Sequence, residues 1–198
     1  GQFGGHIGLT GAGAALRYPH GAPYTMLYRG ALVIGTSSLR VSDGIADFDF
    51  SPAPGGPLKL IEGSPRADQA GVGYLQEKTR GGLNAIGVKI RQTSLVWRNS
   101  PDNKYAILEY TVHNPHSAEL RSFYIGVYAD WDIPDSIPTR DIVRWNGALK
   151  TGYMLSPTFP EFGCGGLTLV SDQTVSGHRA IRNSQYIHSG YSDRVAFG

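Results

Sequence analysis

The sequence lacks several features that mark common functional classes. It contains a single cysteine, Cys164, so the chain can form neither an intrachain disulfide nor a four-thiolate zinc site. Charged residues make up only 17% of the chain, below the roughly 25% of an ordinary globular domain. The basic residues form no cluster, which argues against nucleic acid as a partner, because phosphate binding needs Lys and Arg gathered on one face.

Long apolar runs and helical patterns are also missing. No apolar stretch approaches the ~20 residues that a helix needs to cross a bilayer, so we predict no membrane span. No segment of about ten residues or more has convincing helical periodicity, and no internal repeat stands out. Helical bundles, propellers and solenoids are therefore not expected.

Turn-forming and apolar residues are both plentiful. The 198 residues include 27 Gly and 12 Pro, and 40% of the chain is hydrophobic. We predict an all-β fold, an antiparallel β-sandwich with long Gly/Pro-rich loops, in one domain spanning residues 1–198. Because the chain begins at Gly1 without Met and ends in what reads as the start of a strand at residues 195–198, we expect it to be excised or processed from a longer chain.

The clearest strand pattern lies in the middle of the chain. Residues 88–97 alternate at the period of a pleated strand, and turns separate them from expected strands at 104–113 and 120–129. We predict that these three strands form an antiparallel meander, with the third in a central position because both of its faces are substantially apolar. Residues 43–82 are expected to be long loops with short strands. Further strands are expected at 24–35, 141–146, 150–155, 166–170 and 174–182.

Acidic residues gather where the third of these strands ends. Asp130 and Asp132 lie two residues apart, and Asp135 follows in a Pro-containing segment. Calcium takes about six to eight oxygen ligands, so carboxylates on a loop that leaves a strand end form a candidate calcium site. The spacing is not that of an EF-hand. The alternative is that Asp130 and Asp132 cap turns, pair with Arg140 or Arg144, or orient Trp131.

Aromatic residues suggest a second kind of site. The chain has eleven Tyr, seven Phe and three Trp, and sugars stack on exposed aromatic rings. Trp97, Trp131 and Trp145 lie at expected strand ends and are the candidate ligand-binding residues for a glycan. The alternative is that these rings fill the core.

Three motifs could carry catalysis or bind metal, and each has a plainer explanation. Residues 35–38 (GTSS) resemble the stretch around the nucleophile of subtilisin-like peptidases, but a strand or turn follows instead of a buried helix. His113 and His116 flank a turn and supply only two metal ligands. Cys164 lies between glycines and has no basic neighbour in sequence that would activate it. We therefore predict no catalytic residue.

Several segments resemble a known module. Residues 104–114 (KYAILEYTVHN), 123–133 (FYIGVYADWDI) and 27–35 (LYRGALVIG) are similar to a β-rich module of very large secreted bacterial proteins. Those proteins include subtilisin-like peptidases and proteins with a C-terminal sorting domain. The resemblance implies an extracellular or cell-surface location, and it carries over no catalytic residue.

These observations lead to one main hypothesis and two alternatives. We expect a non-catalytic structural or adhesive module of a larger secreted or surface assembly, in contact with neighbouring domains or copies of itself. Polymerisation into a filament through the terminal strands is one variant. The first alternative is a glycan- or calcium-binding accessory module of a secreted hydrolase, with calcium as the candidate cofactor. The second is a hydrolase, which needs a nucleophile and a base that meet in a cleft.

Overall fold

The protein is nearly all β, with 48% of its residues in strands, so the predicted fold class is confirmed. The computed structural model describes residues 16–19, 22, 24–44, 49–78, 85–133 and 140–181, together with three two-residue strands nearer the start of the chain. Short 3-10 turns lie at Asp102–Lys104 and Pro160–Phe162. Over these described residues, no helix has the length and apolar character needed to cross a bilayer.

The chain forms two compact units, which are described separately. The first contains Gly1–Ile7, Ala31–Val127 and Asp193–Gly198, and the second contains Gly8–Gly30 and Tyr128–Ser192. Compactness alone does not decide whether either unit folds independently, so the single domain over residues 1–198 stays a prediction.

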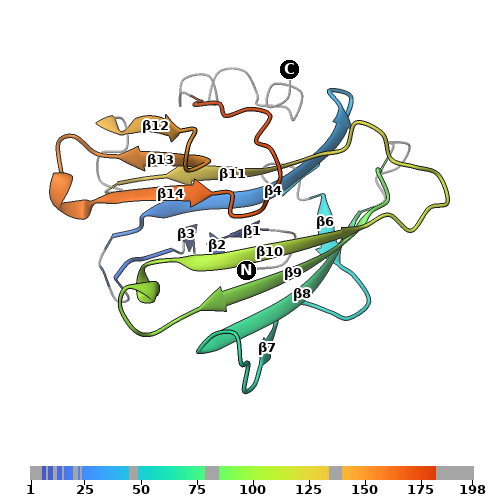
Figure 1. The fold of residues 1–198 in the computed structure, drawn as a ribbon, viewed down its shortest axis with the longest axis horizontal. Helices are drawn as coiled ribbons and strands as arrows, with labels where there is room; N and C mark the ends of the chain where they lie inside the picture. Colours follow the sequence, from blue (N-terminus) through green and yellow to red (C-terminus); the bar gives the residue numbers. More distant parts are fainter. Residues whose placement is uncertain are drawn as a thin grey trace. The chain divides into compact units, whose positions relative to one another are not determined.

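A four-stranded sheet is built around β4 (Leu27–Ser37). Its order is β1 (His6–Ile7), β4 and β11 (Tyr124–Trp131), and β5 (Arg40–Asp43) also pairs with β4. Figure 1 shows β11 running beside β4. β4 carries an aliphatic run in which Ala31, Leu32 and Ile34 are fully buried. Such a continuous apolar run is typical of a strand covered on both faces.

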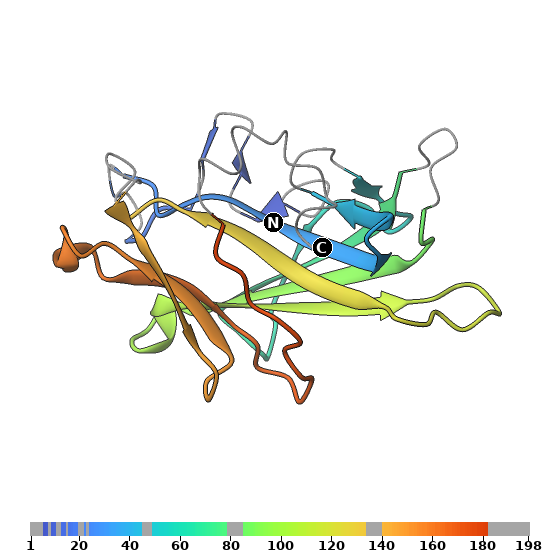
Figure 2. The same ribbon diagram turned by 90° about the horizontal axis from the view of Figure 1, so that it is seen from above.

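A five-stranded antiparallel sheet lies in the first unit. Its order is β10 (Ala106–His113), β9 (Lys89–Val96), β8 (Gln69–Glu77) and β6 (Phe50–Pro52), and β7 (Lys59–Ile61) also pairs with β8. Figures 1 and 2 show β8, β9 and β10 side by side. The long ladders of β9 with both neighbours make it a central strand of this sheet.

The second unit contains a smaller antiparallel sheet. It is made of β12 (Ile142–Asn146), β13 (Thr151–Leu155) and β14 (Cys164–Thr168), in that order. A two-stranded pair, β2 (Leu9–Thr10) and β3 (Gly13–Ala14), also belongs to this unit.

The main core of the first unit draws on two sheets. Its buried cluster combines side chains from β4 with side chains from β6, β8, β9 and the segment before β9. The members are Leu32, Ile34, Phe50, Leu75, Ile86, Val88 and Ile90. A core shared by two sheets is what a two-layer arrangement requires, and the sandwich itself stays a prediction.

The predicted meander is only partly correct. β9 and β10 form the expected hairpin, with Ala106 opposite Val96 and His113 opposite Lys89. β11, however, pairs with β4 in the other sheet and lies at the end of that sheet's described order. The connection between β10 and β11 is long enough to change sheets, and Leu120 in it packs against the core cluster. The prediction of a central third strand was therefore wrong.

The remaining strand predictions were correct in some regions and wrong in others. β4, β12, β13 and β14 lie close to the expected positions. Between residues 43 and 82 we expected mainly loops, but β8 is nine residues long. Residues 174–181, where another strand was expected, have no strand assigned, and residue 182 lies outside the described part.

Tyr110 provides a test of this packing. The ring packs against the core cluster, and the buried hydroxyl has no hydrogen-bond partner among the described residues. Replacing Tyr110 with Phe removes an unsatisfied buried hydroxyl, so we expect the free energy of unfolding to rise by about 1 kcal/mol at neutral pH. Urea denaturation of both proteins measures the difference, and a less stable Y110F protein would contradict the assigned environment.

The same residue makes stability depend on alkaline pH. Burial raises the pKa of Tyr110 from 10.0 to about 12, because the charged phenolate is poorly solvated in the core. Below pH 10 the phenol is protonated in both the folded and the unfolded chain, so the contribution of Tyr110 to the free energy of unfolding is fully present. Between pH 10 and about 12 that contribution is lost, because the phenol of the unfolded chain ionises first. We expect a loss of about 1.4 kcal/mol per pH unit in this window, and Y110F should lack that part of the loss.

Candidate functional site

The structure gives the predicted calcium ligands an unexpected neighbour. Asp130 lies on β11 and is largely buried, and burial raises the pKa of its carboxyl group while the positive charge of Arg29 on β4 lowers it. Asp132 follows the strand and donates its backbone N–H to the Met26 carbonyl, at 2.9 Å. Asp135 lies outside the described residues. Sequence reasoning considered Arg140 and Arg144 as partners and missed Arg29, which is about a hundred residues away along the chain.

Asp141 is a further carboxylate in this unit. One of its oxygens accepts a hydrogen bond from the Ile133 backbone N–H, at 2.8 Å. Burial raises the pKa of Asp141, and the hydrogen bond from Ile133 opposes that shift. The other carboxylate oxygen, Oδ1, and the buried Ser156 hydroxyl have no hydrogen-bond partner among the described residues. Across the described part of the chain, no three His, Cys, Asp or Glu side chains gather closely enough to hold a metal ion. Calcium binding stays a prediction.

The three tryptophans have different surroundings. Trp131 packs closely against Gly165 of β14, where an added Cβ would lie 2.6 Å from Cζ3 of the indole. Trp145 on β12 stacks on His178, with ring centroids 5.0 Å apart and planes at 17°. Trp97 belongs to the first unit, beside the exposed Tyr105 at 5.4 Å between centroids. Within the second unit, no described ring contact joins Trp131 and Trp145.

The structure also shows where the other sequence motifs lie. Thr36 and Ser37 lie in β4 and Ser38 in the following turn, so the GTSS motif has the strand context that was expected. Cys164 begins β14 and is exposed. The backbone N–H of His116 donates to the Asn114 side chain, at 3.1 Å, within the loop after β10.

Glu77, which sequence analysis did not single out, accepts four hydrogen bonds from the described residues. Its carboxylate accepts the Ser42 hydroxyl of β5 and three consecutive backbone N–H groups, those of Ile86, Gly87 and Val88. Arg40 donates to the Ala85 carbonyl at 2.7 Å and fixes the same segment. This arrangement holds backbone in place and is structural.

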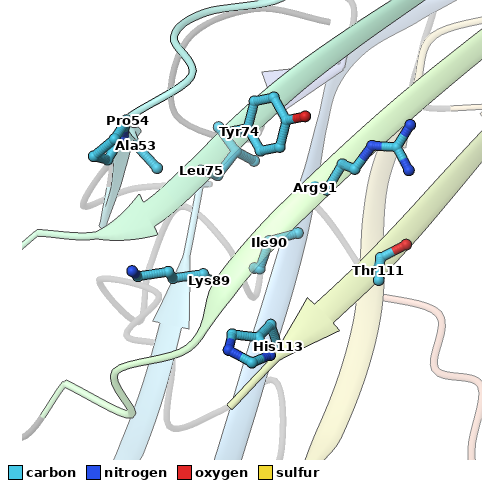
Figure 3. A pocket seen from close by; sticks show the side chains of 9 residues that line it. All are labelled: Ala53, Pro54, Tyr74, Leu75, Lys89, Ile90, Arg91, Thr111 and His113. Atoms are coloured by element: carbon cyan, nitrogen blue, oxygen red, sulfur yellow. The ribbon is translucent and has the colours of Figure 1, made fainter. Parts of the chain in front are cut away.

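A hollow on the first unit is a candidate for ligand binding. It has a volume of about 240 Å³ and a mainly apolar lining, and it is formed by β8, β9, β10 and the segment after β6 (Figure 3). The ladder places Tyr74 opposite Arg91 and Arg91 opposite Thr111. Lys89 lies opposite His113, one step along the same face. These residues therefore share the face opposite to the core residues Leu75 and Ile90.

Sequence analysis missed this hollow because it depends on strand pairing. The alternation of Lys89 and Arg91 was visible, but β8 was expected to be loop, so Tyr74 had no assigned place. Comparison with known proteins adds no relative: no family model, no curated protein and no solved structure matches this chain.

Proposed function

We propose that this chain is a non-catalytic structural or adhesive module of a larger secreted or cell-surface assembly, and that it associates with another copy of itself through β11. The observation that carries this proposal is the apolar exposure of that strand. Tyr124 is 49% exposed, Ile125 48% and Val127 42%. Adjacent residues of a strand point to opposite faces, so apolar side chains are exposed on both faces of β11 here.

Strand position makes this exposure relevant to assembly. Among the described residues, β4 is the strand that pairs with β11, which leaves β11 at one end of the sheet order. An edge strand presents unpaired N–H and C=O groups, and proteins commonly protect such edges with Lys, Pro, charged side chains or bulges. Residues 124–127 (YIGV) contain no charged residue and no Pro. A strand from a second copy can add to such an edge by main-chain hydrogen bonds.

A charge on this strand should prevent association. We expect the wild-type chain to form dimers or longer oligomers as its concentration rises, and the Ile125→Lys protein to remain monomeric because a lysine would be desolvated in the new interface. Sedimentation velocity over a concentration series measures both. Ile125 is half exposed, so the variant should keep its fold, which circular dichroism checks.

Leu39 supplies the matched control. It is 79% exposed in the turn between β4 and β5, away from β11 in sequence, and Leu39→Lys adds the same charge. We expect Leu39→Lys to associate as the wild type does. A wild-type chain that stays monomeric at every concentration, or equal effects of both substitutions, would contradict the role of the β11 edge.

A further inference from the structure

We infer that the hollow on β8, β9 and β10 binds an anionic sugar residue, a hexuronate, through its ring face and its carboxylate. The inference concerns another part of the chain from the β11 edge and does not depend on it. The relevant side chains are Tyr74, Lys89, Arg91, Thr111 and His113, which surround the hollow in Figure 3.

The charges around the hollow favour an anion. Lys89 and Arg91 are exposed and two residues apart on β9, so their Cα atoms lie roughly 7 Å from each other on one face. The nearby carboxylate on this face, Glu109 of β10, already receives both guanidinium nitrogens of Arg66. The positive charge of Arg91 also helps to lower the pKa of the Glu109 carboxyl group. Among the described residues, however, neither Lys89 nor Arg91 forms a direct ion pair, so both side chains can still receive a bound carboxylate.

The size and lining of the hollow favour one sugar ring. Its volume of about 240 Å³ lies below the roughly 300–1,000 Å³ typical of pockets for drug-sized molecules. A free inorganic anion would leave the apolar lining uncovered, and an extended polyanion would need a longer basic stripe. A hexuronate combines a carbon-rich ring face, a carboxylate and hydroxyl groups, one of which can pair with the Thr111 hydroxyl.

Tyr74 forms a preformed wall for such a ring. Gly55 lies directly against it: an added Cβ on Gly55 would be 2.7 Å from Cδ2 of Tyr74, and Gly55 has φ +113°, a conformation that favours glycine. The backbone at Gly55 therefore packs against the aromatic ring and limits its movement. A wall that is already in place reduces the entropy lost on binding.

Ligand titration tests this inference. We expect glucuronate to shift amide resonances of β8, β9 and β10 in a ¹H–¹⁵N NMR titration of the wild-type chain, and neutral glucose to bind at least about tenfold more weakly. Binding of glucuronate should weaken with added salt, because the attraction between charges is screened.

Substitutions at three positions locate the binding to the hollow. We expect Lys89→Gln and Arg91→Gln each to weaken glucuronate binding about tenfold, and Tyr74→Ala to weaken it while Tyr74→Phe does not. The control is Arg121→Gln, which removes a positive charge from a largely exposed side chain in the loop after β10. The Arg121→Gln protein should bind glucuronate with the affinity of the wild type.

Several results would overturn the inference. These are an absence of shifts up to the highest glucuronate concentration, equal affinities for glucuronate and glucose, or unchanged binding in Lys89→Gln and Arg91→Gln. Equal binding of benzoate, a ring carboxylate without hydroxyl groups, would overturn the assignment to a sugar. All variants lie at exposed or half-buried positions, so we expect each to fold. A ¹H–¹⁵N spectrum typical of the folded protein would show that a loss of glucuronate binding arises at the hollow.

Discussion

Replacing Glu77 with alanine is expected to lower the free energy of unfolding by about 3 kcal/mol or more, because the substitution leaves several buried donors without an acceptor. The carboxylate accepts the N–H groups of Ile86 and Val88 at 3.0 and 3.3 Å, as well as those of Gly87 and the Ser42 side chain. Ile86 and Val88 are each only 1% exposed. Their amides have little access to replacement water.

The effect should also spread into the core. Ile86 and Val88 belong to the same buried cluster as Leu75 on β8, so the segment held by Glu77 forms part of the packing between sheets. If the segment moves, apolar surface is exposed in addition to the lost hydrogen bonds. We therefore expect a greater loss than the 1–3 kcal/mol of one unsatisfied buried group.

Urea denaturation of Glu77→Ala, Glu77→Gln and a control measures this effect. Glu77→Gln keeps one acceptor oxygen but loses the charge, so its stability should lie between those of the wild type and Glu77→Ala. Glu119→Ala is the control, because that side chain is 76% exposed and forms only a long contact, 3.5 Å, with Arg121. A Glu77→Ala protein as stable as Glu119→Ala would show that the 86–88 segment does not depend on this carboxylate.

Replacing Gly165 with alanine is the second substitution for which we expect a large loss, about 3 kcal/mol. The new Cβ would lie 2.6 and 2.9 Å from Cζ3 and Cδ2 of Trp131, closer than real Cβ contacts allow. Gly165 is buried in β14, and a large indole ring is not a flexible side-chain end that moves away at little cost. Overpacking of this kind typically costs 1–3 kcal/mol, and sometimes more.

Two measurements separate this effect from a general property of glycine. Urea denaturation gives the loss of stability, and a change in the near-ultraviolet circular dichroism of the folded protein reports the displaced indole. Gly177→Ala is the matched control, because an added Cβ there has no neighbour within 4 Å. We expect that control to stay close to the wild type. A Gly165→Ala protein that keeps both its stability and its spectrum would mean that Trp131 does not rest on β14.

The strands that sequence analysis located are those with local signals. In β9, the alternation around Ile90 and Gln92 appears in the burial pattern, where both are buried and Lys89 and Arg91 are exposed. β8 was missed because Gly71 and Gly73 weaken its pattern. The structure gives a reason for these glycines: an added Cβ on Gly73 would lie 3.3 Å from the Cα of Leu58, so close packing of the chain around β7 requires small residues there.

Candidate sites were less accessible to this reasoning. The carboxylates at the end of β11 were recognised as a group, but the charge that acts on Asp130 comes from Arg29 on a different strand. Trp131 was selected as a ligand-binding residue, whereas its described contact is with Gly165. The hollow combines Tyr74 with Lys89 and His113, which no single stretch of sequence contains.

The sequence by itself determined that the chain is built of strands, and it placed the hairpin of β9 and β10, because alternation and turn residues act over a few neighbouring positions. Only the tertiary structure decided that β11 joins β4 and that β8 brings Tyr74 beside Arg91. Strand partners are chosen by burial of apolar surface between segments far apart in the chain, and one sequence carries no local record of that choice.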